Sequence, residues 1–421
     1  MPVAELPLYD TITPADQAEL VQTVREAVAD NTPIYPMGGR TSLQFGLPPR
    51  ETGIGLSLGG LKRIVDYPAR DMTITVEAGV TIDQLALALA KERQRLPIDL
   101  PDAHRATLGG VIATNTSGAR RYSHGTIRDY VIGISAVDGR GVMFHGGGRV
   151  VKNVAGYDFC KLLVGSLGTI GMIAQVTLRV KPMPECSRFV ACRMRNWPMA
   201  ERILAGLVNS QTTPAAIELL AGPAWSNDPT LGSLSQRDVA HVLVGLEGTE
   251  AEVEWMGDTL WNELRKLGVD ADIISQHHCG GLWVRLAQFP VEGDPALVIK
   301  ASLKPGHTVE FVQRLRKIDP ECSVQSHAGN GVVVARLSKE TSGVSKTLVS
   351  EIQPAAAEHG GHVIVLSCAE PAELTRQCWW GSPGEATAIM EEVKRQFDPK
   401  DLLNRGRFVY PSQSLPALPG L

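Results

Sequence analysis

The feature that most constrains the fold is the uneven distribution of glycine and tryptophan along the 421 residues. Residues 1–180 hold 22 of the 42 glycines, whereas all seven tryptophans come later. Glycine allows sharp turns and close approach of the backbone to a neighbour, so the first part is expected to be rich in such loops. The segment Lys181-Pro182-Met183-Pro184 cannot continue a strand and predicts a linker. We therefore expect a first structural unit that ends near residue 182.

Composition excludes several classes of protein. The 41 Lys and Arg against 45 Asp and Glu give a net charge of -4, without the basic surplus of a nucleic-acid-binding protein. No apolar run reaches the ~18 residues of a membrane span, and the N-terminus lacks a signal-peptide pattern, so a cytoplasmic protein is expected. The seven cysteines are scattered without a C-x-x-C pair and predict neither disulfides nor a zinc or iron–sulfur ligand set.

Helices and strands alternate irregularly, which favours an α+β fold. In the first part, Thr13 as cap and Pro14 at the first helical position predict a helix. A second helix is expected from about Thr81. Strands are expected over residues 33–36, 54–57, 63–67, 73–76, 131–137 and 170–180.

The second part reads as two β-α-β passes of the ferredoxin-like type. Strands are expected near residues 215–220, 240–247, 270–275, 296–303, 322–328, 331–338 and 361–367. Helices are expected from the capping box Thr249-x-x-Glu252, and over 308–318 and 343–358.

Three stretches of the first part could hold a ligand. The first, residues 36–42 (PMGGRTS), follows a predicted strand, and its glycine amides could form a nest for a pyrophosphate. The second covers residues 107–129, and the third comprises residues 152–158 (KNVAGYD) and 165–171 (GSLGTIG). Each stretch alone could be an ordinary loop, and no P-loop or strand-linked G-x-G-x-x-G is present. Their order and separation together favour a binding function.

In this order, the stretches resemble the flavin-binding domain of the vanillyl-alcohol-oxidase (PCMH-type) FAD superfamily, and within it the FAD-binding E subunits of glycolate oxidases. The resemblance covers residues 30–182 and, less closely, 384–410. It implies a two-lobed PCMH-type FAD-binding domain over 1–182, a ferredoxin-like α/β cap domain over 183–370, and a segment over 371–421 that returns to the FAD domain.

The resemblance also implies which residues contact FAD. The pyrophosphate would lie on the loop, the ribityl chain and isoalloxazine on the second stretch, and the adenine side on the last strand. A further set would lie along the dinucleotide, although His124 could equally be a loop histidine bonded to backbone. The pyrophosphate residues are Pro36, Met37, Gly38, Gly39, Arg40, Thr41 and Ser42, and those at the ribityl chain and isoalloxazine are Thr107, Gly109, Gly110 and Asn115. The residues on the adenine side are Ile170, Gly171 and Ile173, and those along the dinucleotide are Gly118, His124, Gly125 and Thr126.

Departures from the family pattern carry further expectations. Relatives with covalent flavin often have a histidine where this chain has Arg40, so FAD is expected to be bound without a covalent link. Leu167 stands where relatives often carry an acid. The H-A-G-D-G-N-x-H motif of relatives that work alone appears here with Asn330 and Val334 in place of the acid and the last histidine. No catalytic residue is therefore assigned from the sequence.

Two further histidine groups are weighed as ligands. The sequence Glu358-His359-Gly360-Gly361-His362 is interpreted as a helix-to-strand junction, with a ligand role as the alternative. The run His277-His278-Cys279 is interpreted as a polar strand end. No metal site is expected.

Three functions remain open, in this order. The chain is the FAD-binding subunit of a glycolate oxidase-like 2-hydroxy-acid dehydrogenase complex, converting glycolate to glyoxylate or supporting a catalytic sister subunit. The resemblance then implies a sister flavin subunit and an iron–sulfur subunit as partners, with attachment to the inner membrane through them. Alternatively, it is a free-standing flavin oxidase or dehydrogenase of a small hydroxylated substrate, or an assembly scaffold with a vestigial flavin site.

Overall fold

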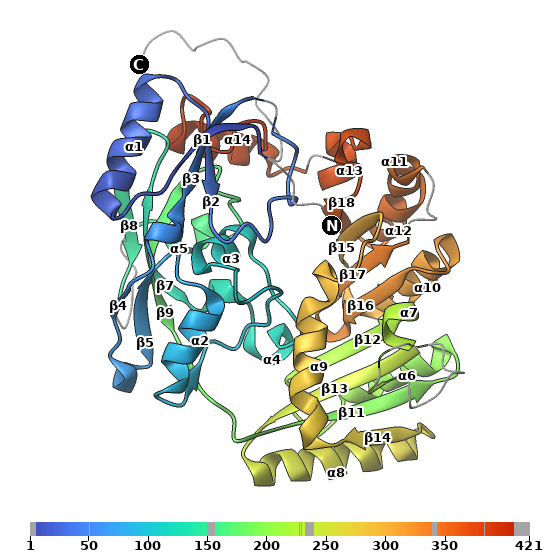
Figure 1. Ribbon diagram of the computed structural model, residues 1–421. Helices are drawn as coiled ribbons and strands as arrows, with labels where there is room; N and C mark the ends of the chain where they lie inside the picture. The colour runs from blue at the N-terminus through green and yellow to red at the C-terminus, as the bar shows by residue number, and fades with distance from the viewer. Residues whose placement is uncertain are drawn as a thin grey trace.

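The computed structural model describes residues 6–49, 51–149, 156–226, 228, 230–231, 240–338, 343–382 and 384–407. Two lobes lie side by side (Figure 1): one contains the N-terminal part of the chain, and the other is built around a large sheet. The α+β fold expected from the sequence is confirmed.

The first lobe contains two sheets of different type. A parallel three-stranded sheet has the order β1-β3-β2, and an antiparallel five-stranded sheet has the order β4-β5-β9-β7-β8. A short pair, β10 (Lys181–Pro182) with β6 (Gln94–Arg95), closes the lobe where the linker was predicted. The strands are β1 (Leu8–Ile12), β2 (Ile34–Met37), β3 (Gly53–Ser57), β4 (Ile64–Asp66), β5 (Thr73–Glu77), β7 (Val131–Val137), β8 (Met143–Gly147) and β9 (Met172–Arg179).

The helices of this lobe begin at side-chain caps. Asp16, rather than Thr13, caps α1 (Gln17–Ala29) by accepting from the amides of Ala18 and Glu19, so this helix begins later than predicted. Thr81 caps α2 (Ile82–Ala90) in a full capping box, as predicted. The remaining helices are α3 (Leu108–Thr114), α4 (Arg121–His124) and α5 (Phe159–Leu163).

The second lobe is an eight-stranded antiparallel sheet with helices on both faces (Figure 1). In spatial order its strands are β14 (Ala271–Ile274), β11 (Cys186–Met194), β13 (Ala240–Gly248), β12 (Ala216–Ala221), β16 (Ser323–His327), β17 (Val332–Leu337), β15 (Leu297–Ser302) and β18 (His362–Cys368). The helices are α6 (Trp197–Val208), α7 (Pro223–Ser226), α8 (Glu250–Lys266), α9 (Gln276–Gln288), α10 (Thr308–Ile318), α11 (Val344–Thr347), α12 (Gln353–Ala357) and α13 (Arg376–Trp380).

Five of these elements differ from the sequence prediction. The run His277-His278-Cys279 lies on helix α9 and not at a strand end. The helix forms because Leu282, Trp283 and Leu286, further along it, pack into a hydrophobic cluster against the sheet. Strand β11 and helices α6, α7 and α13 were not predicted at all.

Side chains alternate between the two faces of this sheet, as strand geometry requires. In β12, Ile217 and Leu219 join the hydrophobic cluster that helices α6, α8, α10 and α12 cover, whereas Ala216 and Leu220 join the cluster under α9. The intervening Glu218 therefore faces the α9 side and is fully buried. The polar residues of the candidate site described below lie on this same face of the sheet.

The two lobes are joined by a buried ion cluster. The guanidinium of Arg120, on the first lobe, pairs with Asp99 and lies 2.8 Å from Glu247 Oε1 on β13, and it covers the ring of Trp283 at 3.6 Å. Arg95 Nη2 lies 2.7 Å from the other oxygen of Glu247. Burial raises the pKa of the Glu247 carboxyl, but the bonds from His124, Arg95 and Arg120 together outweigh it and hold that pKa well below its usual range.

The C-terminal part of the chain returns to the first lobe through α14 (Thr387–Phe397) (Figure 1). The backbone N–H of Asn404 donates to Ile34 O at 2.8 Å, and the backbone N–H of Ile34 donates to Leu402 O at 2.8 Å. The buried Lys394 Nζ donates to Thr169 O at 2.8 Å and to Asp398 at 2.6 Å. This segment therefore completes the wall of the first lobe beside β2.

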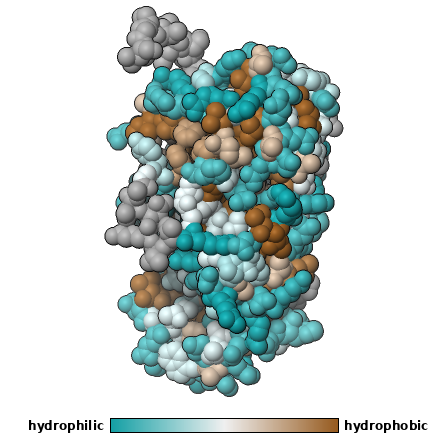
Figure 2. Space-filling view, turned by 90° about the vertical axis from the view of Figure 1, so that its left-hand side faces the viewer, coloured by the Kyte–Doolittle hydropathy of each residue, from teal (hydrophilic) through white to brown (hydrophobic). Residues whose placement is uncertain are grey.

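The face of the molecule in Figure 2 is largely hydrophilic, with scattered hydrophobic patches. Within the part of the chain that the structure describes, no helix is both long and apolar enough to cross a bilayer.

Candidate flavin and substrate site

Two adjoining cavities lie in and beside the first lobe. The smaller, of about 110 Å³, is lined by first-lobe loops and by Asn404 and Arg407 of the returning segment. The larger, of about 300 Å³, lies between the lobes, and residues 40–43, Phe45 and Thr114 line both. A long ligand could therefore extend from one cavity into the other.

Most of the residues predicted to contact FAD line these cavities. The smaller cavity contains Pro36, Met37, Gly38, Gly39, Arg40, Thr41, Ser42, Thr107, Gly109, Gly110, Gly171 and Ile173. The larger one contains Asn115 and Gly118, together with residues 40–42. The structure thus brings residues 36–42, part of 107–118 and part of 165–171 together. Residues 152–155 of the third stretch lie outside the described residues, and residues 156–158 line neither cavity.

Four predicted residues line neither cavity. Ile170 is buried in a hydrophobic cluster, and Thr126 forms a capping box with Asp129. A Cβ on Gly125 would meet the same Asp129 carboxylate. His124 lies at the joint between the lobes, with Nε2 3.2 Å from Arg95 Nη2 and Nδ1 3.3 Å from Lys181 Nζ.

The glycines of the smaller cavity serve two different purposes. A Cβ on Gly39 would lie 1.7 Å from Arg105 O, and one on Gly38 would lie 2.0 Å from Thr107 Oγ1. These two glycines therefore let the 36–42 loop pack against the 105–107 segment. At Gly110, by contrast, the nearest atom to an added Cβ is Thr107 Oγ1 at 3.3 Å, so a larger side chain there would project into the cavity.

The backbone around the cavities is strained. Arg40, Asn115, Leu167 and Asn404 all line a cavity and all have φ between +49° and +58°. Left-handed backbone costs about 1 kcal/mol or more for residues other than glycine and is retained where the surroundings enforce it, often at ligand sites. The strain is held in part by Asn404, whose Nδ2 donates to Leu167 O at 2.5 Å.

The buried Arg407 fixes the loop between the cavities. Its Nη2 donates to Leu43 O at 2.7 Å and to Phe45 O at 2.8 Å. Burial lowers the pKa of this guanidinium to about 10.

Two half-buried cations line the larger cavity. Arg121 on α4 and Lys300 on β15 both line it. Burial, followed by the neighbouring charge of Arg121, lowers the pKa of the Lys300 ammonium, and burial also lowers the pKa of Arg121. An anion in this cavity would relieve the repulsion between them.

A buried histidine–carboxylate pair lies on the same wall. Glu218 and His327 are partners across the β12–β16 ladder, and His327 Nδ1 lies 2.8 Å from Glu218 Oε1. Gln325 Nε2 donates to Glu218 Oε2 at 2.9 Å. A carboxylate bonded to Nδ1 fixes the histidine tautomer, so Nε2 is the nitrogen available to the cavity that the ring lines.

Strand register places Gln325 and Lys300 in one row across three strands. Val334 on β17 pairs with Gln325 on one side and with Lys300 on the other. The apolar Val334 therefore lies between Gln325 and Lys300 in this row. On the cavity wall, Lys300 therefore lies on one side of strand β17, and His327 lies on the other side, on β16.

Several polar atoms on the cavity walls have no partner within the described residues. Asn115 Oδ1, Arg121 Nε and Gln325 Oε1 are buried without a hydrogen bond. Buried polar atoms are usually paired, so these atoms indicate a polar ligand. Backbone amides in strained loops, the exposed Gly110 on the cavity wall and these unpaired atoms fit a phosphate-bearing dinucleotide and a small polar substrate.

Sequence reasoning identified the loops but missed Arg121, Glu218, Lys300 and Gln325 as site residues. Glu218 and Lys300 each stand alone as a charged residue within an apolar strand, in AIELLA and LVIKAS. A charge in a buried strand is costly, so this pattern was the available signal.

Comparison with known proteins defines the class. Residues 11–147 match the model of the FAD binding domain family. The predicted resemblance to PCMH-type FAD-binding oxidoreductases is confirmed, as are FAD as the cofactor and the assignment to FAD-dependent oxidoreductases.

Individual relatives refine this class. The chain is 26% identical to D-2-hydroxyglutarate dehydrogenase of Xanthomonas citri pv. viticola over 94% of this chain and 88% of the relative. It is 35% identical to glycolate oxidase subunit GlcE of Escherichia coli over 40% of this chain and 48% of that subunit. An alkyldihydroxyacetonephosphate synthase structure shares the fold, with a TM-score of 0.71 and 17% identity over 94% of this chain and 77% of that one.

Proposed function

We propose that this chain is the FAD-binding subunit of a 2-hydroxy-acid dehydrogenase complex and that it oxidises the hydroxy acid in its own inter-lobe cavity. The observation that carries the proposal is that Arg121, Lys300 and His327 line one cavity, which adjoins the glycine-lined one. His327 is held there by Glu218. Relatives named as a 2-hydroxyglutarate dehydrogenase and as a glycolate oxidase subunit support the substrate class.

In this proposal the smaller cavity holds the dinucleotide. The loop 36–42 and the first turn of α3 offer backbone amides to the pyrophosphate, and Gly110 leaves the space that the ligand fills. FAD, when bound, accepts the hydride from the substrate carbon.

The residues of the larger cavity bind and deprotonate the substrate. Arg121 and Lys300 hold the carboxylate, which places the adjacent hydroxyl-bearing carbon between the lobes. His327 Nε2 accepts the hydroxyl proton. Glu218 keeps the proton on Nδ1 and stabilises the imidazolium that results.

The electrons then leave for a partner chain. All seven cysteines of this chain are free and buried at separate positions, which supports an iron–sulfur relay on another subunit. The likeness to a glycolate oxidase subunit supports the same arrangement, with a sister flavin subunit beside this one.

The substrate experiment uses the purified FAD-loaded chain under anaerobic conditions. Addition of glycolate, D-lactate or D-2-hydroxyglutarate should bleach the flavin absorbance, and the acid that acts fastest identifies the preferred chain length. Unchanged absorbance with every acid would contradict oxidation in this cavity. Bleaching only after a partner subunit is added would assign the oxidation to that partner.

A second experiment tests the flavin linkage. Arg40 cannot form the histidyl link of covalent relatives, so acid precipitation should release all FAD into the supernatant. A yellow pellet would contradict non-covalent binding.

A further inference from the structure

A second group of ligand-type side chains lies on the opposite face of the large sheet from α9. His307 precedes α10, Glu310 is in its first turn, and His359 follows the end of α12. One potential ligand atom from each residue lies within 4.8 Å of those from the other two. None of the three lines either cavity described above.

The local sequence explains why these side chains meet. His307 and Glu310 are three residues apart at the start of α10, a spacing that places both on one side of the helix. His359 is brought to them by Gly360, whose φ of +69° ends the helix before β18 begins, as the helix-to-strand interpretation predicted. That interpretation did not foresee what the histidine would face.

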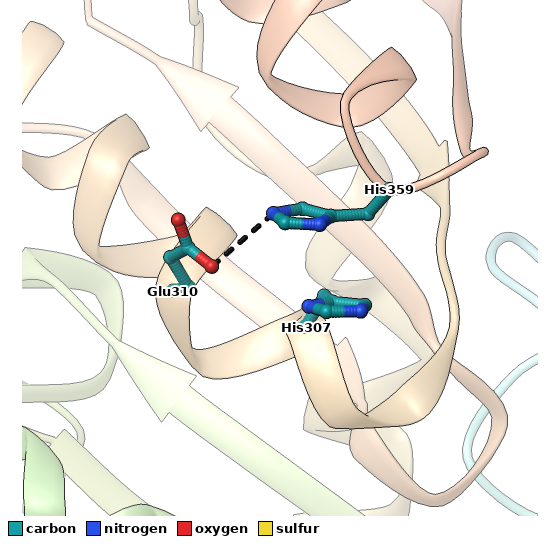
Figure 3. Close-up of side chains that lie close together, drawn as sticks. All are labelled: His307, Glu310 and His359. Atoms are coloured by element: carbon teal, nitrogen blue, oxygen red, sulfur yellow. Dashed lines mark ion pairs between the residues drawn. The ribbon is translucent and has the colours of Figure 1, made fainter.

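The three side chains form a compact arrangement (Figure 3). The rings of His307 and His359 stack with centroids 3.8 Å apart and an interplanar angle of 6°. His359 Nε2 points toward Glu310 Oε2, 3.2 Å away. A metal ion bound between this nitrogen and the carboxylate would replace their direct contact.

Arg314 orients the carboxylate from its other side. Its Nη2 lies 2.9 Å from Glu310 Oε1, and its Nη1 lies 2.7 Å from Glu358 Oε2. Oε2 of Glu310 therefore remains directed at the histidines. With two neutral imidazoles, the two carboxylates and one guanidinium leave a net charge of -1, which favours a cation over an anion.

We propose that His307, Glu310 and His359 form a binding site for a divalent metal ion of the zinc type. Two imidazoles and one carboxylate are a ligand set that zinc accepts, with a water molecule in the fourth position. Metal–ligand bonds of about 2.0–2.2 Å require ligand atoms about 3.4 Å apart, so the group must contract slightly. Parallel rings cannot both aim a nitrogen at one ion, and one imidazole must therefore rotate out of the stack.

The bound ion would link the start of α10 to the end of α12. The segment that leads into His307 follows β15, the strand of Lys300, and the segment after His359 enters β18. The site is separate from the flavin and does not depend on the proposed hydroxy-acid oxidation.

Zinc binding to the FAD-loaded chain tests the proposal directly. After chelator treatment and desalting, the protein is titrated with ZnCl₂ by calorimetry, and retained zinc is measured by elemental analysis. The wild-type chain should bind about one zinc ion, and the conservative substitution Glu310→Gln should weaken binding about tenfold or more because it removes the anionic ligand. His359→Ala should abolish binding at this site.

The matched control is His278→Ala, which removes an exposed histidine on α9 far from the cluster in sequence. It should leave the zinc stoichiometry unchanged, and unchanged circular dichroism and flavin content establish that each variant is folded. If a variant does not fold, proton NMR of the wild-type chain with added Co²⁺ gives an independent result. Coordination to this ion shifts the imidazole proton resonances of the histidines that bind it. Absence of zinc uptake by the wild type would overturn the proposal. So would zinc uptake by Glu310→Gln and His359→Ala that equals uptake by the wild type.

Discussion

His327 Nδ1 lies 2.8 Å from Glu218 Oε1, and both residues belong to neighbouring strands of a sheet in which each is buried. A histidine held in this way has one nitrogen fixed by a carboxylate and the other free to act on a ligand. Because His327 also lines the larger cavity, this pair carries the proposed proton transfer.

Replacement of Lys300 should change substrate affinity and its pH dependence. Burial and Arg121 lower the pKa of this ammonium below the ordinary value of about 10.4, so it loses its charge at a lower pH than an exposed lysine. In steady-state assays, kcat/KM should therefore fall as the pH rises through this lowered pKa. Lys300→Met should raise KM at least tenfold at neutral pH, because a charge-assisted contact to the substrate carboxylate is lost.

The matched variant is Lys300→Arg, which stays charged across this range. Its alkaline limb should move to higher pH. An identical alkaline limb in both proteins would assign the titration to another group.

Gly110 offers a clean test of the flavin cavity. Gly110→Leu places a Cβ 3.3 Å from Thr107 Oγ1 and the rest of the side chain in the cavity, so it should reduce the flavin-to-protein ratio of the purified chain by tenfold or more while the protein stays folded. Gly280→Leu on α9 is the control, since an added Cβ there meets no atom within 4 Å. Full flavin content in Gly110→Leu would show that the dinucleotide does not pass this position. Changes at Gly38 or Gly39 are less informative, because they disrupt loop packing itself.

The joint between the lobes should respond to pH through Glu247. Its carboxyl has a lowered pKa in the folded chain, so its contribution to stability is present above the unfolded value of about 4.3 and is lost as the pH falls through the folded value. Glu247→Gln leaves Arg120 and Arg95 without their shared partner and should cost about 3 kcal/mol at pH 7. Urea unfolding, with the exposed Glu254→Gln as control, measures this difference, and it should shrink at acidic pH. A loss below 0.5 kcal/mol, or a loss that grows in acid, would contradict this role.

The sequence could predict the strands wherever apolar residues alternated or ran continuously. Most strands of the large sheet, including β16 and β17, lie within a residue or two of the prediction. Strand β11 was missed because Arg188 and Arg193 interrupt its apolar pattern. Helix α9 was missed because His277, His278 and Cys279 were interpreted as the polar end of the preceding strand, whereas the helical form depends on packing further along.

The residues of the candidate site also fall into two groups, those that a local sequence pattern indicates and those that only the folded sheet brings together. Glycine-rich loops carry a local pattern, and the sequence therefore indicated the residues around Gly39 and Gly110 as binding loops. The Glu218–His327 pair and the Gln325–Val334–Lys300 row depend on strand register over separations of up to about a hundred residues. Register is decided by the whole sheet, so no local pattern could have placed these residues together.

The most direct test of the account compares flavin reduction in the wild type and in His327→Gln, both loaded with FAD and mixed anaerobically with the preferred hydroxy acid. The variant keeps a group that can bond Glu218 but loses the proton acceptor, so the observed reduction rate should fall by about 10²–10⁴-fold at unchanged flavin content. The exposed His278→Gln variant should match the wild type. Equal reduction rates in wild type and His327→Gln would contradict proton abstraction by His327 and, with it, the proposed chemistry of this cavity.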